Sequence, residues 1–346
     1  MNQTLNSIRK ILLTMLVALG IGALFIIAIG ENPIEAYGAL LNGAFNGKLR
    51  LGTTLAGFTP LLLTSIAFAI AAKAGAFNVG VEGEVFLGGI TAAYIGAYWD
   101  LPAPLLYIAC FLGAMAVAAA WAFIPAALKV YYGVNEVCTT ILMNTVALYI
   151  TSYLVSGPMS AGTANPQSPP VKVTLYQFMK PSSANVGLII AIIVVVLVIL
   201  MLNKTSWGYK IRTVGFNPIH ADYVGISSKK VFISAMMLSG MLGGIAGCIE
   251  VLGVHGYFLN NFATGLGSNG MLASLIVKNN MVFAPFMAFF LAVLKAGAMG
   301  MQQTTGVPKA LVDTITAVFI IMATMETAFE FKKRKKKQAE KKEEKA

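Results

Sequence analysis

Two carboxylates and an amide lie close together at the start of an apolar stretch. Residues 77–84 read FNVGVEGE, which places Asn78, Glu82 and Glu84 beside small, flexible residues. An unpaired charge at such a position costs several kcal/mol, so these groups need partners or a function. Glycines permit a broken helix whose exposed amides bind polar groups, which favours a translocation path. Helix capping and bonding between helices is the alternative, and both interpretations stay open for Asn78 and Glu82.

A second polar stretch, residues 208–226, carries a compact helix signal. Asn217-Pro218 is typical of a helix start, and Gly225 is typical of a helix end. The short helix between them would offer Ile219, Tyr223 and Ile226 to a partner groove. The alternative is an ordinary loop that rests on lipid headgroups through Lys210 and Arg212.

Other side chains suit binding rather than catalysis. Amides and hydroxyls inside apolar stretches could line a path for a neutral, polar solute, and the candidates besides Asn78 and Glu82 are Thr139, Thr140, Asn144 and Gln302. We find no glycine-rich phosphate loop and no nucleophile–base pair, so we expect no catalytic residue. His220 and His255 are far apart in the sequence, and we expect neither a metal site nor a bound cofactor in this chain.

Composition indicates which kind of element must position these groups. The chain has 346 residues, of which 57% are hydrophobic and 11% are charged, and its mean hydropathy is +0.76. Soluble domains carry roughly 25% charged residues, so the chain is predicted to be an all-α integral membrane protein. The net charge of +11 does not indicate nucleic acid, because residues 332–346 alone hold nine Lys/Arg and three Glu.

Apolar stretches long enough to cross a membrane recur along the chain. A crossing helix needs about 20 apolar residues. We predict about ten helices, some of them short or broken: Ile11–Gly30, Leu51–Ala72, Val81–Tyr98, Leu101–Leu128, Val137–Val155, Val186–Asn203, Val231–Ile249, Gly267–Val277, Met281–Gly300 and Lys309–Met325. A signal peptide is the alternative for the first stretch.

Charge predicts the orientation of these helices. With a cytoplasmic N-terminus, 19 of the 25 Lys/Arg residues fall on the cytoplasmic side, as the positive-inside rule requires. Both termini are then cytoplasmic, residues 156–185 form an external loop, and residues 204–230 form a cytoplasmic segment, hereafter the coupling segment. Residues 1–329 make up one polytopic domain, and the basic tail, residues 330–346, attracts anionic lipid.

The two halves of the chain are similar in plan. Leu51–Val155 and Val231–Phe329 have similar lengths, would enter the membrane from opposite sides and contain four spans each. Each has a Gly/Asn-rich break before a short apolar segment, at residues 75–80 and 265–270. This predicts an inverted repeat.

The coupling segment carries the clearest likeness to a known family. It contains a Gly-x-Asn-Pro-x-x-Ala-x-Tyr-x-Gly-Ile pattern, formed by Gly215, Asn217, Pro218, Ala221, Tyr223, Gly225 and Ile226, with Asp222 inside it. This resembles the permease subunits of ATP-binding-cassette (ABC) importers for sugars, nucleosides and branched-chain amino acids. Residues 31–37 (ENPIEAY), 77–84 and 305–308 (TGVP) are similar to the bacterial nucleoside branch, whereas residues 267–275 (GSNGMLASL) lack its more acidic or aromatic opening.

The resemblance, which covers Ile11 to Phe329, implies a function and a set of partners. These are a second permease subunit in a heterodimer, an ABC ATPase that binds ATP and docks on the coupling segment, and an external substrate-binding lipoprotein, all at the cytoplasmic (inner) membrane of a bacterium. Nucleosides are the favoured substrate, with ribose-type sugars and branched-chain amino acids as alternatives. An ion-coupled secondary transporter would instead need intramembrane acids such as Glu82, Glu84 or Asp313 to titrate.

Overall fold

The structure, a computed structural model, describes residues 19–308, 310–314 and 317, and it is helical. Within these residues six helices are long and apolar enough to cross a membrane. They are α3 (Gly47–Lys73), α5 (Ala103–Tyr132), α6 (Glu136–Ser156), α7 (Gly187–Lys204), α10 (Ser228–Ile249) with its extension η1 (Glu250–His255), and α12 (Ala284–Thr305). The helix Leu19–Ala28 and α2 (Pro33–Phe45) form a bent pair, at 117°, that could be a seventh crossing. The chain is therefore an all-α membrane protein that crosses the membrane several times, while the predicted count of about ten is not confirmed.

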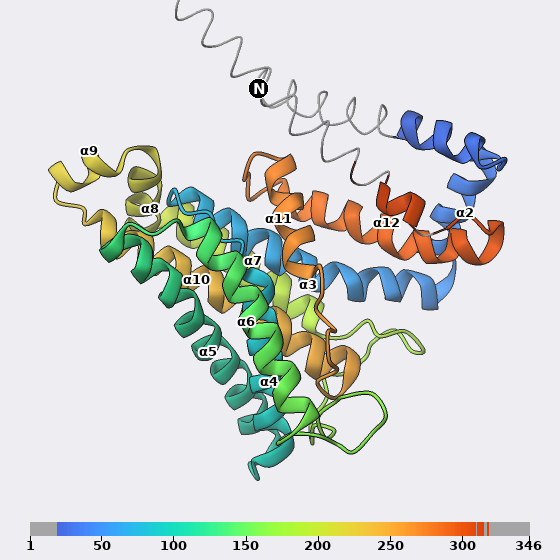
Figure 1. Ribbon diagram of the computed structural model, residues 1–346, viewed down its shortest axis with the longest axis horizontal. Helices are drawn as coiled ribbons and strands as arrows, with labels where there is room; N and C mark the ends of the chain where they lie inside the picture. The colour runs from blue at the N-terminus through green and yellow to red at the C-terminus, as the bar shows by residue number, and fades with distance from the viewer. Residues whose placement is uncertain (1–18, 309, 315–316, 318–346) are drawn as a thin grey trace, which may run out of the picture. The chain divides into compact units, whose positions relative to one another are not determined.

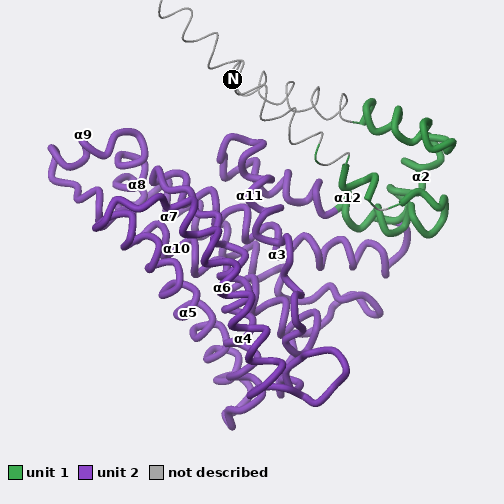
Figure 2. The backbone as a smooth tube through the Cα atoms, in the orientation of Figure 1, with its two compact units in different colours: residues 1–45, 293–346 green, residues 46–292 purple. Residues whose placement is uncertain are grey.

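The described chain divides into two compact units, which Figure 2 distinguishes by colour. In the smaller unit, α2 packs on the end of α12 through small residues, since a Cβ added to Gly43 would lie 2.8 Å from the carbonyl oxygen of Gly297. Such glycine contacts let two helices approach closely. Close packing matters in a membrane, because the lipid is as apolar as the helices and no hydrophobic effect drives them together. The larger unit spans Asn46–Ala292 and holds most of the predicted site residues.

The centre of the larger unit is α4 (Val81–Tyr98), which is buried along most of its length and packs against α5 and α10. A glycine-rich face of α10 makes this packing possible. A Cβ added to Gly240 would lie 2.6 Å from the carbonyl oxygen of Ala118 on α5, and one added to Gly243 would lie 2.8 Å from Glu84 Cβ on α4. The helices therefore meet backbone to backbone.

The two ends of this unit are built differently (Figure 1). At one end lie α8 (Ser206–Phe216) and α9 (Pro218–Tyr223). At the other end the predicted external loop is tied to η1 and the residues after it. The amide of Leu175 donates to the carbonyl of Leu252 over 2.8 Å, and that of Ser168 donates to Phe258 over 2.9 Å.

Several predicted bounds are confirmed. The predicted helix Val81–Tyr98 is α4 without change, and Val137–Val155 and Val186–Asn203 fall within one residue of α6 and α7. The second break differs: residues 266–270 already belong to α11 (Leu266–Ile276), and the non-helical part is residues 256–265. The predicted span Lys309–Met325 lies largely, and the basic tail wholly, outside the described residues.

Candidate functional site

Asn78 joins three parts of the larger unit. It lies in the first break, residues 74–80, and none of its surface is exposed. Its Nδ2 donates to Glu84 Oε1 over 2.8 Å and to Ser239 Oγ of α10 over 2.9 Å. Its Oδ1 accepts from the amide of Gly80, the residue that precedes α4, over 2.9 Å. Asn78 thus fixes the start of α4 to the middle of α10.

Asn144 holds the same start from α6. Its Nδ2 donates to the carbonyl of Val79 over 2.9 Å, and its Oδ1 accepts from the amide of Gly83 over 2.8 Å. The first amides of a helix have no partner inside the helix, and a side chain that accepts from them stabilises the helix start. Asn144 does this for α4 from a neighbouring helix.

Glu82 connects the two breaks. Its Oε2 accepts from Ser268 Oγ over 3.0 Å and from the amide of Ser268 over 3.4 Å, in the first turn of α11. The carboxylate thereby lies at the positive end of the α11 dipole. Gly267 lies against the backbone of Glu82, where a side chain would not fit. The N-terminal ends of α4 and α11, which follow the two breaks, therefore meet.

These contacts form one cluster, the break junction, consisting of Asn78, Glu82, Glu84, Asn144, Ser239 and Ser268. Ser239 lies midway along α10. The first residue of α11, Leu266, lies beside α3, where its carbonyl accepts from the buried Thr64 Oγ1 over 3.2 Å. Both breaks thus lead the chain into the interior of the bundle. A half-helix that begins inside a membrane bundle is typical of substrate sites in transporters.

The remaining predicted path residues lie on α6 and α12. Thr140 is buried on α6 next to Gly80, and its hydroxyl donates to the carbonyl of Glu136 over 2.7 Å. Thr139, one residue earlier, bonds within α6 as well. Gln302 is exposed on the part of α12 that belongs to the smaller unit. The path role predicted for these residues stays a prediction.

Sequence reasoning left out three members of the junction: Glu84, Ser239 and Ser268. Ser268 lay within the predicted second break but was given no role in the site. Glu84 was seen in the motif but not assigned to the site; it is buried, and its Oε2 lies beside Gly243 without a hydrogen-bond partner in the described part of the chain. Ser239 has no motif around it. Only its polar side chain on the glycine-rich stretch of α10 could have suggested that it faces another polar group.

The coupling segment has the predicted short helix. Asn217 precedes α9, and its Oδ1 accepts from the amide of His220 over 3.0 Å, while Pro218 takes the first position. Gly225 follows with φ +80°, a conformation that favours glycine. The amide of Ile226 donates back to the carbonyl of the buried Ala221 over 2.9 Å, which closes the turn.

The outer face of this segment is apolar and exposed. Tyr223 is 87% exposed, Ile219 is 68% exposed, and Phe216, before α9, is 94% exposed. Ile226, which was expected to join them, is half-buried instead. Exposed aromatic and aliphatic side chains grouped on one tip mark an interaction surface.

Two contacts attach the coupling segment to the bundle. Asp222 accepts from the amide of Ser228 over 2.8 Å and from its hydroxyl over 2.7 Å, at the start of α10. These two bonds hold the pKa of the exposed Asp222 carboxyl below its usual value. Gly215, at the end of α8, lies directly on the backbone of Lys73, where α3 ends and the first break begins.

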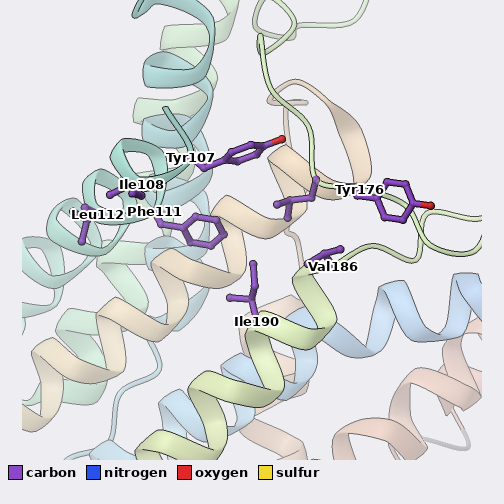
Figure 3. A pocket seen from close by; sticks show the side chains of 8 residues that line it. Tyr107, Ile108, Phe111, Leu112, Tyr176, Val186 and Ile190 are labelled. Atoms are coloured by element: carbon purple, nitrogen blue, oxygen red, sulfur yellow. The ribbon is translucent and has the colours of Figure 1, made fainter. Parts of the chain in front are cut away.

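One groove on this unit is apolar. It has a volume of about 450 Å³ and lies between α5, α7 and the external loop; its lining residues are Tyr107, Ile108, Phe111, Leu112, Leu175, Tyr176, Val186 and Ile190 (Figure 3). The Tyr107 hydroxyl is directed to the carbonyl of Thr174, over 2.6 Å. A polar solute would find few partners here, which leaves the break junction as the better candidate site.

Comparison with known proteins gives a consistent result. Residues 50–324 match the family model described as the branched-chain amino acid transport system permease component. The guanosine ABC transporter permease protein NupP of Bacillus subtilis is 33% identical over 92% of this chain and 94% of its own length. A glucose ABC transporter permease protein of Haloferax volcanii is 32% identical over 89% of this chain and 85% of its own. The nucleoside ABC transporter permease protein NupB of Lactococcus lactis is 30% identical, over 94% and 93%.

The family model covers most of the chain, and the three relatives align over nearly all of it. The predicted motif of the coupling segment lies inside the matched range and adopts the helix that the motif implied. Together with the crossing helices, these findings show that the chain belongs to the family of membrane-spanning permease components of ABC importers.

Proposed function

We propose that this chain is the permease subunit of an ABC importer for nucleosides. The observation that supports nucleosides as the substrate is the similarity, over nearly the whole chain, to permease proteins named for guanosine and for nucleosides. The ATP-driven movement itself is assigned to a separate ATPase subunit. The chain supplies the path, its gate and the surface on which that ATPase docks.

The break junction is the proposed gate of the path. Glu82 already occupies the positive end of α11, so this helix end does not select for an anionic solute. The half-buried Glu82 carboxylate and the Ser268 hydroxyl can instead exchange hydrogen bonds with the hydroxyls of a neutral solute. A nucleoside has such hydroxyls on its ribose, whereas a branched-chain amino acid has none and presents a charged ammonium and a charged carboxylate instead.

An inverted repeat accounts for the packing around this gate. In this repeat, the long helix α3 of the first half corresponds to α10 of the second, and the short helix α4 corresponds to α11. Each long helix then packs along the short helix of the other half: α3 along α11, and α10 along α4. Phe58 of α3 also meets Phe289 of α12, with ring centroids 5.3 Å apart, as α10 meets α5. Counting α4, α11 and the last predicted span as crossings or half-crossings would bring the total close to ten.

The coupling segment is the proposed docking site of the ATPase. Phe216, Ile219 and Tyr223 would fill a groove on that subunit, because exposed aromatic anchors dominate the energetics of protein interfaces. The predicted orientation places this end in the bacterial cytoplasm, together with both termini. A substrate-binding lipoprotein would then deliver the solute at the opposite end, near the external loop.

A second permease subunit would complete the path. Two guanosine ABC transporter permease proteins of Bacillus subtilis are similar to this chain, which supports a pair of related but different subunits. Large apolar side chains remain exposed on α6, among them Leu142, Tyr149 and Tyr153. A partner helix or lipid would cover them.

A simple sugar is the second candidate substrate, because one relative is named for glucose. Uptake of radiolabelled uridine, ribose, glucose and leucine by cells lacking the gene, and by cells in which it is restored, separates the candidates. We expect loss and recovery of uridine uptake alone. Loss of only a sugar or of leucine would keep the importer and replace the substrate, and unchanged uptake of all four would contradict the proposal.

A further inference from the structure

The break junction is connected to the coupling segment by α10. At its start, Ser228 of α10 donates to Asp222 at the end of α9 by both its amide and its hydroxyl. At its middle, Ser239 accepts from Asn78 in the first break. One helix therefore bonds to the proposed docking site at one point and to the proposed gate at another.

Between these two points α10 is held by packing. Met236 is buried in a cluster with Ala71 of α3, Ala76 of the first break and Ala126 of α5. Beyond Ser239, one turn further along α10, Gly243 lies against Glu84. A densely packed helix moves as a rigid body rather than deforming, so a displacement at Ser228 reaches Ser239.

Among the described residues, the hydrogen bond from Asn78 Nδ2 to Ser239 Oγ is the one polar contact between Asn78 and α10. Both side chains are fully buried, so bulk solvent does not reach the bond. The other bonds of Asn78 run to Gly80 and Glu84, at the start of α4. Pulling on Asn78 therefore reorients the start of α4, which includes Glu82 and its bond to Ser268.

We propose that Ser239 is a positioning residue that transmits movement of the coupling segment through α10 to Asn78 and so to the gate formed by the two breaks. The proposal rests on the proposed function, because it assumes that the ATPase acts on the coupling segment. It assigns the transmission to one hydroxyl and one helix.

The test compares Ser239→Ala with Ser234→Ala. Ser239→Ala removes this contact and leaves the bonds of Asn78 to Gly80 and Glu84 in place. Ser234→Ala removes a hydroxyl from the same helix that donates only to the carbonyl of Val231, over 2.9 Å. Hydrogen exchange of residues 74–83 and 206–230 is measured in the complete purified complex, with and without trapping by ATP and vanadate.

In the wild type and in Ser234→Ala, trapping should change exchange in both segments. In Ser239→Ala it should change residues 206–230 as in the wild type, and the change at residues 74–83 should be lost. A wild-type response at residues 74–83 in Ser239→Ala overturns the transmission while leaving the proposed function intact. If trapping changes nothing at residues 206–230 in the wild type, the docking of the ATPase is wrong, and the transmission falls with it.

A second measurement separates transmission from folding. The ratio of solute transported to ATP hydrolysed is determined for Ser239→Ala, Asn78→Ala and the double variant, together with the melting temperature of each complex. We expect Ser239→Ala to lower the ratio at a temperature well below the melting temperature of the complex, even though the buried Asn78 amide loses an acceptor and the melting temperature falls. The double variant should match Asn78→Ala. Independent, multiplicative losses in the double variant would show that the two residues do not act through their bond.

Discussion

The bonds of Asn144 to the start of α4 give the most direct test of the site geometry. Asn144→Leu removes both bonds at similar side-chain volume and leaves the amide of Gly83 and the carbonyl of Val79 without their partner on α6. An unsatisfied, partly buried polar group costs about 1–3 kcal/mol, so the first turn of α4 should lose about 2 kcal/mol or more. Since each 1.4 kcal/mol corresponds to a factor of ten, local opening should rise roughly 30-fold.

Hydrogen exchange at the amide of Gly83 measures this opening directly. We expect exchange there to accelerate roughly 30-fold in Asn144→Leu and uptake to fall with it, because the start of α4 carries Glu82. Thr145→Val, an exposed position one residue further along α6, serves as the control and should change neither. Wild-type exchange at Gly83 in Asn144→Leu would refute the account of how α6 fixes α4.

Three further predictions concern docking, packing and pH. Tyr223→Asp should weaken co-purification of the ATPase about tenfold or more, because it places a charge at an exposed position that docking would bury. Lys229→Gln, exposed nearby, should leave co-purification unchanged, and equal recovery with both variants would contradict the docking site. Gly247→Ala should lower stability by about 1–3 kcal/mol, because the new Cβ would clash with the carbonyl oxygen of Val85. Gly38→Ala, with open space around it, should be neutral or slightly stabilising. Equal melting temperatures of the two variants would contradict the packing of α10 on α4. The Asp222 carboxyl has a pKa below its unfolded value, so its stabilising bonds are fully present above about pH 4 and are lost as the pH falls through the lowered pKa. Protection of the Ser228 amide against hydrogen exchange, corrected for the intrinsic exchange rate, should therefore be constant from about pH 5 to 8. A decline in protection within that range would contradict the assignment.

Local signals in the sequence predicted the helices well. The bounds of α4 were found because a Gly/Asn-rich stretch precedes Val81 and a Trp-Asp-Leu-Pro stretch follows Tyr98. The start of α9 was predicted because Asn217 and Pro218 act on the residues next to them, and short-range hydrogen bonds decide a helix cap. The fold class followed from composition alone.

Contacts between distant residues could not be predicted in the same way. Asn78 and Ser239 are 161 positions apart, and Glu82 and Ser268 are 186 apart, so nothing in their spacing indicates that they meet. The second break was placed too late because residues 266–270 contain glycines and Asn269 yet form the first turns of α11. Tertiary contacts with Glu82 and Thr64 support that helix start against its weak local propensity.

The π-helical turn at residues 250–255 also lacked a sequence signal. It extends α10 by backbone bonds that span one residue more than those of an α-helix, and such turns are rare. Its position beside the external loop, where Leu252 accepts from Leu175, became visible only in the folded chain.

ATP-driven transport in a closed system tests the central claim most directly. The complete complex is reconstituted in liposomes with the substrate-binding protein outside, and uptake of radiolabelled uridine is followed with ATP or a non-hydrolysable analogue inside. The account predicts accumulation with ATP alone, unaffected by collapse of proton and sodium gradients, and loss of accumulation in Tyr223→Asp. Accumulation driven by an ion gradient without ATP would contradict it and identify a secondary transporter instead.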